Sequence, residues 1–350
     1  MQKDYEGLFD SVPCEILQIE LPFGHMCQIY RVNPRATEIM KVHLSAGDMI
    51  KLIEYLDEDN LKYAREIIRR LRKPGDKSAF LLKTYHSAIE GPDRMALKKL
   101  FEKWQEGMQQ NNGWNALFWC NHDQPRIVSR MGDENRCWKE SAKMLAAAVH
   151  MMRGTPYIYQ VEELGKTNAH YTDISQYRDV ESLNYYEILL SQGKTKEEAL
   201  KILASKSRDN SRTPMQWSAE KNAGFSDADP WLGVPENYKE INAEKETKET
   251  DSIYSFYRRL IELRKEKKVI SEGSIEFLEK ENTDVLAYKR AYEKEEIIVF
   301  NNLTGKEITV QMQPEWKEYH KLLGNYPDDS ANIDGEKLVL RPYETLSLEA

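Results

Sequence analysis

A run of seven residues from Trp114 to Cys120, in which Asn115 is the one clearly polar side chain, most limits what this chain can fold into. The run has the length of a β-strand and lacks the alternation of apolar and polar residues found in a half-exposed strand. It is typical of a parallel strand buried on both faces. Helical patterns flank it at 95–108 and 135–152, and a second short strand is predicted at 157–159. This alternation predicts βα units.

The segments on either side differ in character. Residues 58–72 carry apolar side chains at intervals of three and four, which predicts an amphipathic helix. Residues 160–250 are polar and rich in loops, with helices predicted at 182–191 and 196–205, and another helix is predicted at 252–268. Loops this long within a compact protein usually have a function or cover a site.

From about Ile270 the chain has the pattern of a small antiparallel β domain. Short strands are predicted at 285–288, 297–300, 308–312 and 346–348. In the strand at 308–312 apolar and polar residues alternate, as expected where one face of a sheet meets water.

Composition argues against several classes of partner. The formal net charge of −8 predicts no general basic surface for nucleic acid or anionic lipid. No apolar run approaches the roughly 20 residues that span a bilayer, and the first residues do not resemble a secretion signal, so we expect a cytoplasmic protein without a membrane partner. The cysteines form no C-x-x-C pair and are expected to be free thiols; they are Cys14, Cys27, Cys120 and Cys137.

The sequence predicts no metal ion and no cofactor. Its seven histidines have no metal-ligand spacing, and the cysteines do not cluster with them. Gly165 and Gly193 each begin a Gly-Lys-Thr triplet that resembles the end of a phosphate-binding loop. Such a loop also needs a glycine upstream, and Gln160 and Ile188 stand at those positions.

Polar residues follow the apolar run directly, at 121–126 (Asn-His-Asp-Gln-Pro-Arg). In α/β barrels, side chains at the carboxyl end of a strand face the active site. A carboxylate, an imidazole and a guanidinium so close together are costly to desolvate unless they are paired or have a task. These residues are therefore candidates for a site. A purely structural Asp–Arg pair with a hydrogen-bonded histidine is the alternative.

Residues 114–126 resemble the fourth signature region of the α-amylase family of glycoside hydrolases. Residues 154–165 and 207–217 resemble further stretches of the same family, and the resemblance covers roughly 95–350. It is closest to the branch that holds trehalose-6-phosphate hydrolases and oligo-1,6-glucosidases. The Phe-Trp-Cys triplet at 118–120 favours the phosphotrehalase side of that branch.

The resemblance implies an α/β and all-β chain. It would contain the C-terminal part of a (β/α)8 barrel, with strands seven and eight at 114–120 and 157–159, and then an antiparallel β-sandwich. The expected domains are a small α+β segment at 1–80, a linker at 81–94, a partial barrel with long substrate-side loops at 95–269, and the sandwich at 270–350.

The family hydrolyses α-glucosidic bonds with retention, through an aspartate nucleophile and a glutamate acid/base. By resemblance, Asp123 is the third carboxylate, which stabilises the transition state, and His122 binds sugar hydroxyls. Arg212 resembles the arginine that holds the non-reducing glucose, and Arg126 is a candidate contact to sugar or phosphate. A loop arginine paired with Asp209 is the alternative for Arg212. The implied partner is a small sugar or sugar phosphate.

The sequence departs from the family in two ways. Val161 stands where the family usually has glycine and Lys166 where it usually has methionine, and a β-branched residue at a glycine position is expected to strain the turn. Upstream of Met95 there is no Gly-Phe-Arg-x-Asp pattern, so the nucleophile and acid/base are not found. About 190 residues remain for the barrel, against roughly 250 for a complete one. We therefore expect a truncated catalytic domain.

The first 80 residues weakly resemble a PAS sensor domain, through Tyr5–Cys14 and Tyr30–Ala36. An unassigned α+β segment is the alternative. Three functions follow. The chain is a hydrolase acting on trehalose 6-phosphate (giving glucose and glucose 6-phosphate) or on α-1,6- or α-1,4-linked oligoglucosides. Alternatively, it is a PAS-like sensor or interaction protein that forms a homodimer through its N-terminal segment and carries a passive hydrolase remnant. The third function is a fragment that needs another chain to supply strands one to six.

Overall fold

The computed structural model describes residues 14–20, 26–32, 93–327, 333–334 and 336–350. The chain divides into two compact units, Met1–Leu82 and Lys83–Ala350, and each is described by itself.

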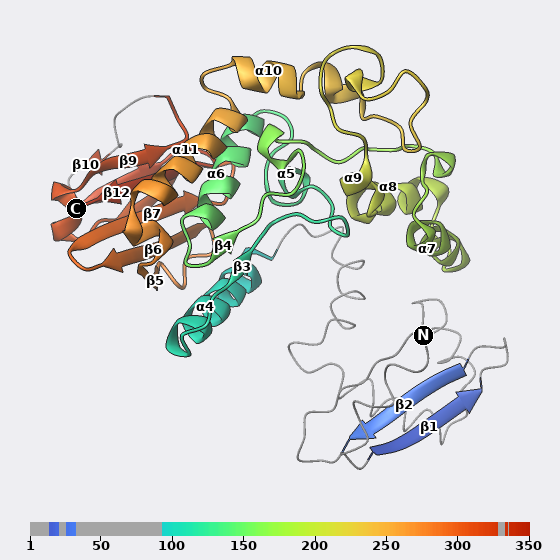
Figure 1. The fold of residues 1–350 in the computed structure, drawn as a ribbon, viewed down its shortest axis with the longest axis horizontal. Helices are drawn as coiled ribbons and strands as arrows, with labels where there is room; N and C mark the ends of the chain where they lie inside the picture. The colour runs from blue at the N-terminus through green and yellow to red at the C-terminus, as the bar shows by residue number, and fades with distance from the viewer. Residues whose placement is uncertain (1–13, 21–25, 33–92, 328–332, 335) are drawn as a thin grey trace. The chain divides into compact units, whose positions relative to one another are not determined.

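In the first unit, β1 (Cys14–Glu20) pairs antiparallel with β2 (Met26–Val32), with Ile16 opposite Tyr30 (Figure 1). The helix predicted at 58–72 lies outside the described residues, as does most of the segment that resembles a PAS domain.

The second unit begins with α4 (Arg94–Gln110), which confirms the helix predicted from residue 95. Asp93 caps it, because its carboxylate accepts a hydrogen bond from the Ala96 amide. After α5 (Ile127–Met131) comes α6 (Trp138–His150), which is buried on every side from Ser141 to its end. A helix with this pattern belongs at the centre of a core.

The two predicted strands form a short parallel pair, which confirms their direction but not their length. β3 (Ala116–Leu117) pairs with β4 (Thr155–Pro156), so the second strand precedes its predicted position at 157–159. The pairing ends with the hydrogen bond from the Tyr157 amide to the Leu117 carbonyl. The expected burial of both faces is wrong, because Phe118 is 50% exposed while Leu117 is buried.

The loop-rich stretch contains the two predicted helices, α7 (Val180–Ser191) and α8 (Lys196–Lys206). They share a hydrophobic cluster with Tyr171 and Tyr177, which anchors the loop before them. The remaining elements are η3 (Glu162–Leu164), η4 (Ile174–Gln176), α9 (Asp209–Arg212), η5 (Lys221–Gly224), η6 (Glu236–Lys239) and α10 (Ala243–Lys248).

The helix predicted at 252–268 is α11 (Ile253–Glu266), and a break at Lys267 separates it from α12 (Lys268–Ser271). Lys267 has extended backbone angles, so the helix cannot continue through it. Across the described residues, no helix combines the length and apolar character needed to cross a membrane.

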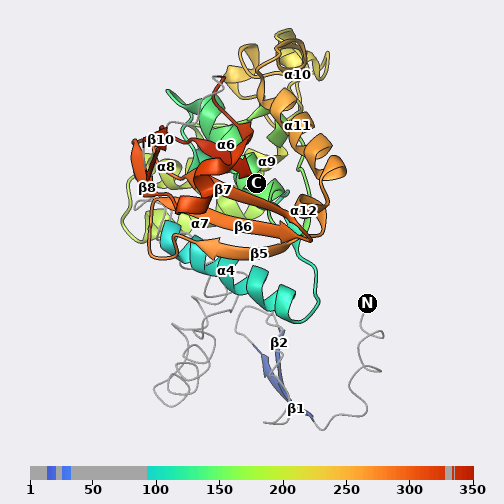
Figure 2. The same cartoon turned by 90° about the vertical axis from the view of Figure 1, so that its left-hand side faces the viewer.

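The C-terminal part is antiparallel β structure, as predicted, in two sheets with strand orders β5-β6-β7-β12-β9 and β10-β11-β8. Figure 2 shows β5, β6 and β7 side by side in the larger sheet. The bounds are β5 (Ser274–Leu278), β6 (Val285–Tyr292), β7 (Glu295–Asn302), β8 (Ile308–Gln311), β9 (His320–Gly324), β10 (Ile333–Asp334), β11 (Lys337–Leu340) and β12 (Thr345–Glu349), with η7 (Pro314–Glu318) between β8 and β9. The strands β5, β9, β10 and β11 are additional to those predicted.

The larger sheet lies between two hydrophobic clusters. On one face, Tyr288 and Val299 pack in the same cluster as residues of α6 and α11. On the other, Phe300 packs in a cluster with Val310 and Leu338 of the smaller sheet. The predicted alternation along β8 is confirmed, since Val310 is buried and its neighbours Thr309 and Gln311 are exposed. The C-terminal sheets therefore support α6, the helix between the two parallel strands.

Candidate functional site

The polar segment after β3 forms a turn that presents Asp123 to solvent. The side chain of Asn121 accepts a hydrogen bond from the Asp123 amide at 2.8 Å, which is an Asx turn. His122 Nε2 lies 3.2 Å from Asp123 Oδ2, and the two side chains are 71% and 45% exposed. The structure therefore holds a carboxylate and an imidazole side by side at the end of β3.

Arg212, at the end of α9, reaches both of these residues. Its Nη2 donates to Asp123 Oδ1 at 2.8 Å, and its Nε donates to the His122 carbonyl at 2.9 Å. The alternative pairing of Arg212 with Asp209 is wrong. The Asp209 carboxylate instead accepts hydrogen bonds from the amides of Arg178 and Asp179. Three of the predicted site residues thus meet across a long sequence separation.

A second arginine, Arg208, is not among the predicted site residues and belongs to the same group. Arg208 Nη2 donates to Asp179 Oδ1 at 2.6 Å, and Arg208 Nη1 lies 3.7 Å from Asp123 Oδ1. Burial opposes ionisation of Asp179, yet hydrogen bonds from Arg208 and Ser182 hold the pKa of its carboxyl below the usual value. The four-residue spacing between Arg208 and Arg212 on one helical turn was the available signal.

Arg126 does not take part in this surface. It is fully buried, and its guanidinium donates to the carbonyls of Gln160, Asn210 and Ser211 at 2.7, 3.2 and 2.9 Å. It also stacks on the Tyr159 ring, 5.3 Å from the centroid. The expected sugar or phosphate contact does not agree with this environment. Because Asn210 and Ser211 belong to α9, the hydrogen bonds from Arg126 hold in place the helical turn that carries Arg212.

The two departures from the family pattern lie in one turn, in which the Lys166 amide donates to the Val161 carbonyl at 3.2 Å. Val161 has φ 62° and ψ 6°, a left-handed conformation that confirms the expected strain. Lys166 is buried, and its Nζ donates to the Pro214 carbonyl at 2.6 Å. Burial, and secondarily the nearby charge of Arg126, lowers the pKa of Lys166 well below its ordinary value.

The same turn carries a buried carboxyl, that of Glu162. Glu162 accepts a hydrogen bond from Tyr257 Oη at 3.1 Å, and burial raises the pKa of Glu162 to about 7. Burial likewise raises the pKa of the Cys120 thiol to about 12. Cys120 and Cys137 are free thiols, as predicted; the side chains of Cys14 and Cys27 lie outside the description.

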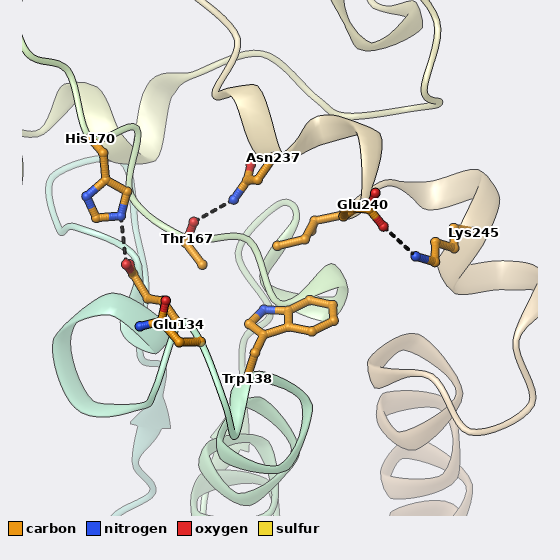
Figure 3. Close-up of a pocket in the computed structure, with 9 residues that line it drawn as sticks. Glu134, Trp138, Thr167, His170, Asn237, Glu240 and Lys245 are labelled. Atoms are coloured by element: carbon orange, nitrogen blue, oxygen red, sulfur yellow. Dashed lines mark hydrogen bonds and ion pairs between the residues drawn. The ribbon is translucent and has the colours of Figure 1, made fainter.

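A pocket of ≈ 480 Å³ lies elsewhere, between α6 and the loops before α10 (Figure 3). Trp138 lines it, together with the His170–Glu134 ion pair at 2.7 Å. It contains none of the predicted site residues. In the part of the chain that the structure describes, no group of three or more histidine, cysteine, aspartate or glutamate side chains is placed to hold a metal ion.

Comparison with known families identifies both parts of the second unit. Residues 75–273 match the α-amylase catalytic domain, and residues 285–346 match the C-terminal domain of the α-amylase SusG. Neither match reaches the first 74 residues, and the comparisons give no support to the PAS resemblance.

Individual relatives agree with these matches. The trehalose-6-phosphate hydrolase of Bacillus subtilis is 47% identical over 259 residues, which are 73% of this chain and 46% of that protein. The oligo-1,6-glucosidase of Bacillus cereus is 42% identical over 255 residues, which are 72% and 45% of the two chains.

A solved structure extends the agreement to the fold. The trehalose-6-phosphate hydrolase of Bacillus licheniformis superimposes with a TM-score of 0.71 at 48% identity, over 74% of this chain and 47% of that one. A mutant of that enzyme has been crystallised in complex with PNG. The chain spans about half the length of the curated relatives it matches. It belongs to the α-amylase family of glycoside hydrolases, in the branch of trehalose-6-phosphate hydrolases and oligo-1,6-glucosidases.

Proposed function

We propose that this chain supplies the sugar-holding side of a retaining α-glucosidase site. The substrate of the whole catalytic domain is then trehalose 6-phosphate or an oligoglucoside with α-1,6 or α-1,4 linkages. In this proposal β3 and β4 are the last two strands of the (β/α)8 barrel, residues 95–269 are its C-terminal part, and residues 270–350 form the β-sandwich. The hydrogen bond between Arg212 and Asp123 beside His122 is the observation that carries the proposal.

The chemistry of the group suits a glucose ring. Asp123 offers carboxylate oxygens to sugar hydroxyls, while Arg212 and His122 offer N–H donors. Charge-assisted hydrogen bonds of this kind are shorter and stronger than neutral ones. Arg212 also binds the His122 carbonyl, which fixes the orientation of the segment before sugar arrives. Preorganised polar groups lose less free energy on binding than mobile ones.

Asp123, His122 and Arg212 are not sufficient for the covalent reaction. Retention needs a nucleophile and an acid/base whose carboxyl groups lie about 5–5.5 Å apart. In the segments of this chain that resemble the family, no residue is identified as the nucleophile or as the acid/base. We therefore expect the chain by itself to bind an α-glucoside weakly and not to cleave it.

Titration of the full chain with glucose and methyl α-glucoside, followed by NMR or calorimetry, tests this proposal. Asp123→Asn is expected to weaken binding by about tenfold, the effect of losing roughly 1.4 kcal/mol. Asp284→Asn is the matched control, since Asp284 is also 45% exposed and paired with an arginine, Arg94. Equal sugar affinities of the Asp123→Asn variant and the unchanged chain would contradict the proposal.

A turnover assay with p-nitrophenyl α-glucoside tests the second part. Release of nitrophenol by the purified chain, abolished by Asp123→Asn, would show that the bond-breaking acids are present after all.

A further inference from the structure

The pocket between α6 and the loops before α10 is built around a tryptophan ring that the protein holds in place. Trp138 Nε1 donates to the Gly165 carbonyl at 2.7 Å, and an indole has no other donor. The ring also packs in a cluster with the buried Ile241. The pocket volume of ≈ 480 Å³ is in the range of small-molecule sites. Because the ring is fixed before a ligand arrives, less free energy is lost on binding.

Two ion pairs flank this ring. His170 Nε2 lies 2.7 Å from Glu134 Oε2, and Lys245 Nζ lies 2.9 Å from Glu240 Oε2. Figure 3 shows Trp138 between the two pairs. Both cations of the pocket lining are therefore already paired with a carboxylate of the same lining.

Asn237 adds an acceptor that the protein leaves unused. Its Nδ2 donates to Thr167 Oγ1 at 2.7 Å, which fixes the orientation of the amide. Its Oδ1 is buried and has no hydrogen-bond partner among the described residues. A buried acceptor without a donor is unfavourable, and a ligand hydroxyl beside Asn237 can remove this cost.

The charges of the lining favour a neutral ligand. Burial opposes ionisation of Glu134, yet hydrogen bonds from His170 and Ser129 hold the pKa of its carboxyl below the usual value. The hydrogen bond to Glu134 also raises the pKa of His170. Two carboxylates thus stand against Lys245 and a protonated His170. An anionic ligand would be repelled by Glu134 and Glu240, and a cationic one would compete with the two cations already bound to them.

A fixed aromatic ring surrounded by acceptors suits a sugar ring. One face of a pyranose consists of C–H groups, whose partial positive charge matches the negative π face of an indole. Its hydroxyls can donate to carboxylate and amide oxygens. We propose that this pocket is a sugar-binding site in which a neutral pyranose, such as the glucose unit of an α-glucoside, stacks on Trp138. The inference goes beyond the proposed function, because the pocket contains none of His122, Asp123 and Arg212.

Fluorine NMR of the full chain labelled with 5-fluorotryptophan tests the inference at the pocket itself. The Trp138 line is assigned by its loss in a Trp138→Phe variant. We expect methyl α-glucoside to shift this line in a saturable way, and glucose 6-phosphate at the same concentration to leave it in place. The line of Trp104 is the internal control, since Trp104 is an exposed tryptophan of α4 that does not line the pocket.

Glu134→Gln keeps the shape of the side chain and removes its charge. We expect it to weaken the binding of methyl α-glucoside, followed at the Trp138 line, by about tenfold, as the loss of a charged acceptor does. Glu262→Gln is the matched control, since Glu262 is a glutamate of α11 that pairs with arginines outside the pocket. Unchanged melting temperatures would confirm that both variants fold.

Four results would overturn the inference. One is a Trp138 line that methyl α-glucoside moves no more than it moves the Trp104 line. Another is an equal shift with glucose 6-phosphate, which would exclude selection of a neutral ring. The third is binding to Glu134→Gln that is as tight as binding to Glu262→Gln. The last is a shift caused by choline and not by methyl α-glucoside, which would assign the pocket to an organic cation.

Asp123→Asn separates this site from the sugar-holding group of the proposed function. A Trp138 shift that persists in this variant supports the pocket, whether or not other sugar binding is lost. A shift that disappears would assign the binding to the group around Asp123 and remove the pocket site. A persistent Trp138 shift with no sugar binding that depends on Asp123 would remove the proposed function and leave the pocket standing.

Discussion

Arg212 and Asp123 lie 89 positions apart in the sequence, and a hydrogen bond of 2.8 Å joins Nη2 of the arginine to Oδ1 of the aspartate. The same guanidinium binds the carbonyl of His122. The loop-rich stretch after β4 is thereby attached to the turn after β3. Buried residues near these two segments are expected to hold them in place. The predictions below concern four of them: Arg126, Val161, Lys166 and Glu162.

Replacing Arg126 is expected to be far more damaging than replacing Arg212. Arg126→Met leaves the carbonyls of Gln160, Asn210 and Ser211 without their donor, and each unpaired buried polar group costs about 1–3 kcal/mol. We expect the free energy of unfolding in urea to fall by about 3 kcal/mol or more. Arg212→Lys, at a partly exposed ion pair, should change it by less than about 1 kcal/mol. Similar losses for both would contradict the positioning role of Arg126.

Val161→Gly is expected to be nearly neutral although it empties a buried position. Val161 packs with Leu164 and Ile241, so the truncation removes apolar contacts. It also removes a left-handed conformation that costs a non-glycine residue about 1–2 kcal/mol. We expect the unfolding free energy to change by less than about 1 kcal/mol. Leu164→Ala, in the same cluster without that strain, should cost about 2–5 kcal/mol, so equal losses would argue against strain at Val161.

Lys166→Met is expected to stabilise the chain most at neutral pH. The pKa of Lys166 is lowered by burial, so the unfolded chain binds this proton more tightly than the folded one. Folding stability due to Lys166 therefore rises as the pH increases from its folded pKa toward about 10.4. The variant lacks this dependence. Its advantage over the unchanged chain in urea unfolding should shrink between pH 7 and pH 10, and an advantage that grows would refute the prediction.

Glu162→Gln is expected to have the opposite pH dependence. The folded chain keeps the Glu162 proton up to a pKa of about 7, whereas the unfolded chain loses it near 4.5. Stability due to Glu162 therefore falls as the pH rises from about 4.5 to 7, by about 3 kcal/mol. The glutamine variant keeps an acceptor for Tyr257 and lacks this fall. Its unfolding free energy should exceed that of the unchanged chain at pH 8 and match it near pH 4.5.

Much of the local architecture was predictable from the chain's own patterns. The helices α4, α6, α7, α8 and α11 lie within a few residues of their predicted bounds. For α4 the signal was an apolar stripe at intervals of three and four residues. The C-terminal antiparallel strands were recognisable for the same kind of reason. Shorter or less regular elements were not, among them β5 and β9, since short strands carry few residues from which to detect a period.

The candidate site was predictable only in its composition. The polar residues at 121–126 mark the end of an apolar strand, and three predicted residues meet there: His122, Asp123 and Arg212. The burial of Arg126 was not predictable, because its partners are backbone carbonyls 34 to 85 positions away. Every residue offers the same carbonyl, so no side-chain pattern marks which carbonyls a buried guanidinium will find.

The sequence by itself determined the family and the alternation of strand and helix around 114–152, because these depend on residue types at short spacing. Through the family resemblance it also implied the strain at Val161. Only the tertiary structure decided that Arg126 is fully buried while Arg212 is partly exposed, that Arg208 lies near Asp123, and that Phe118 is exposed. Such outcomes depend on which distant segments pack together, and packing removes water from some side chains and leaves it on others of the same type.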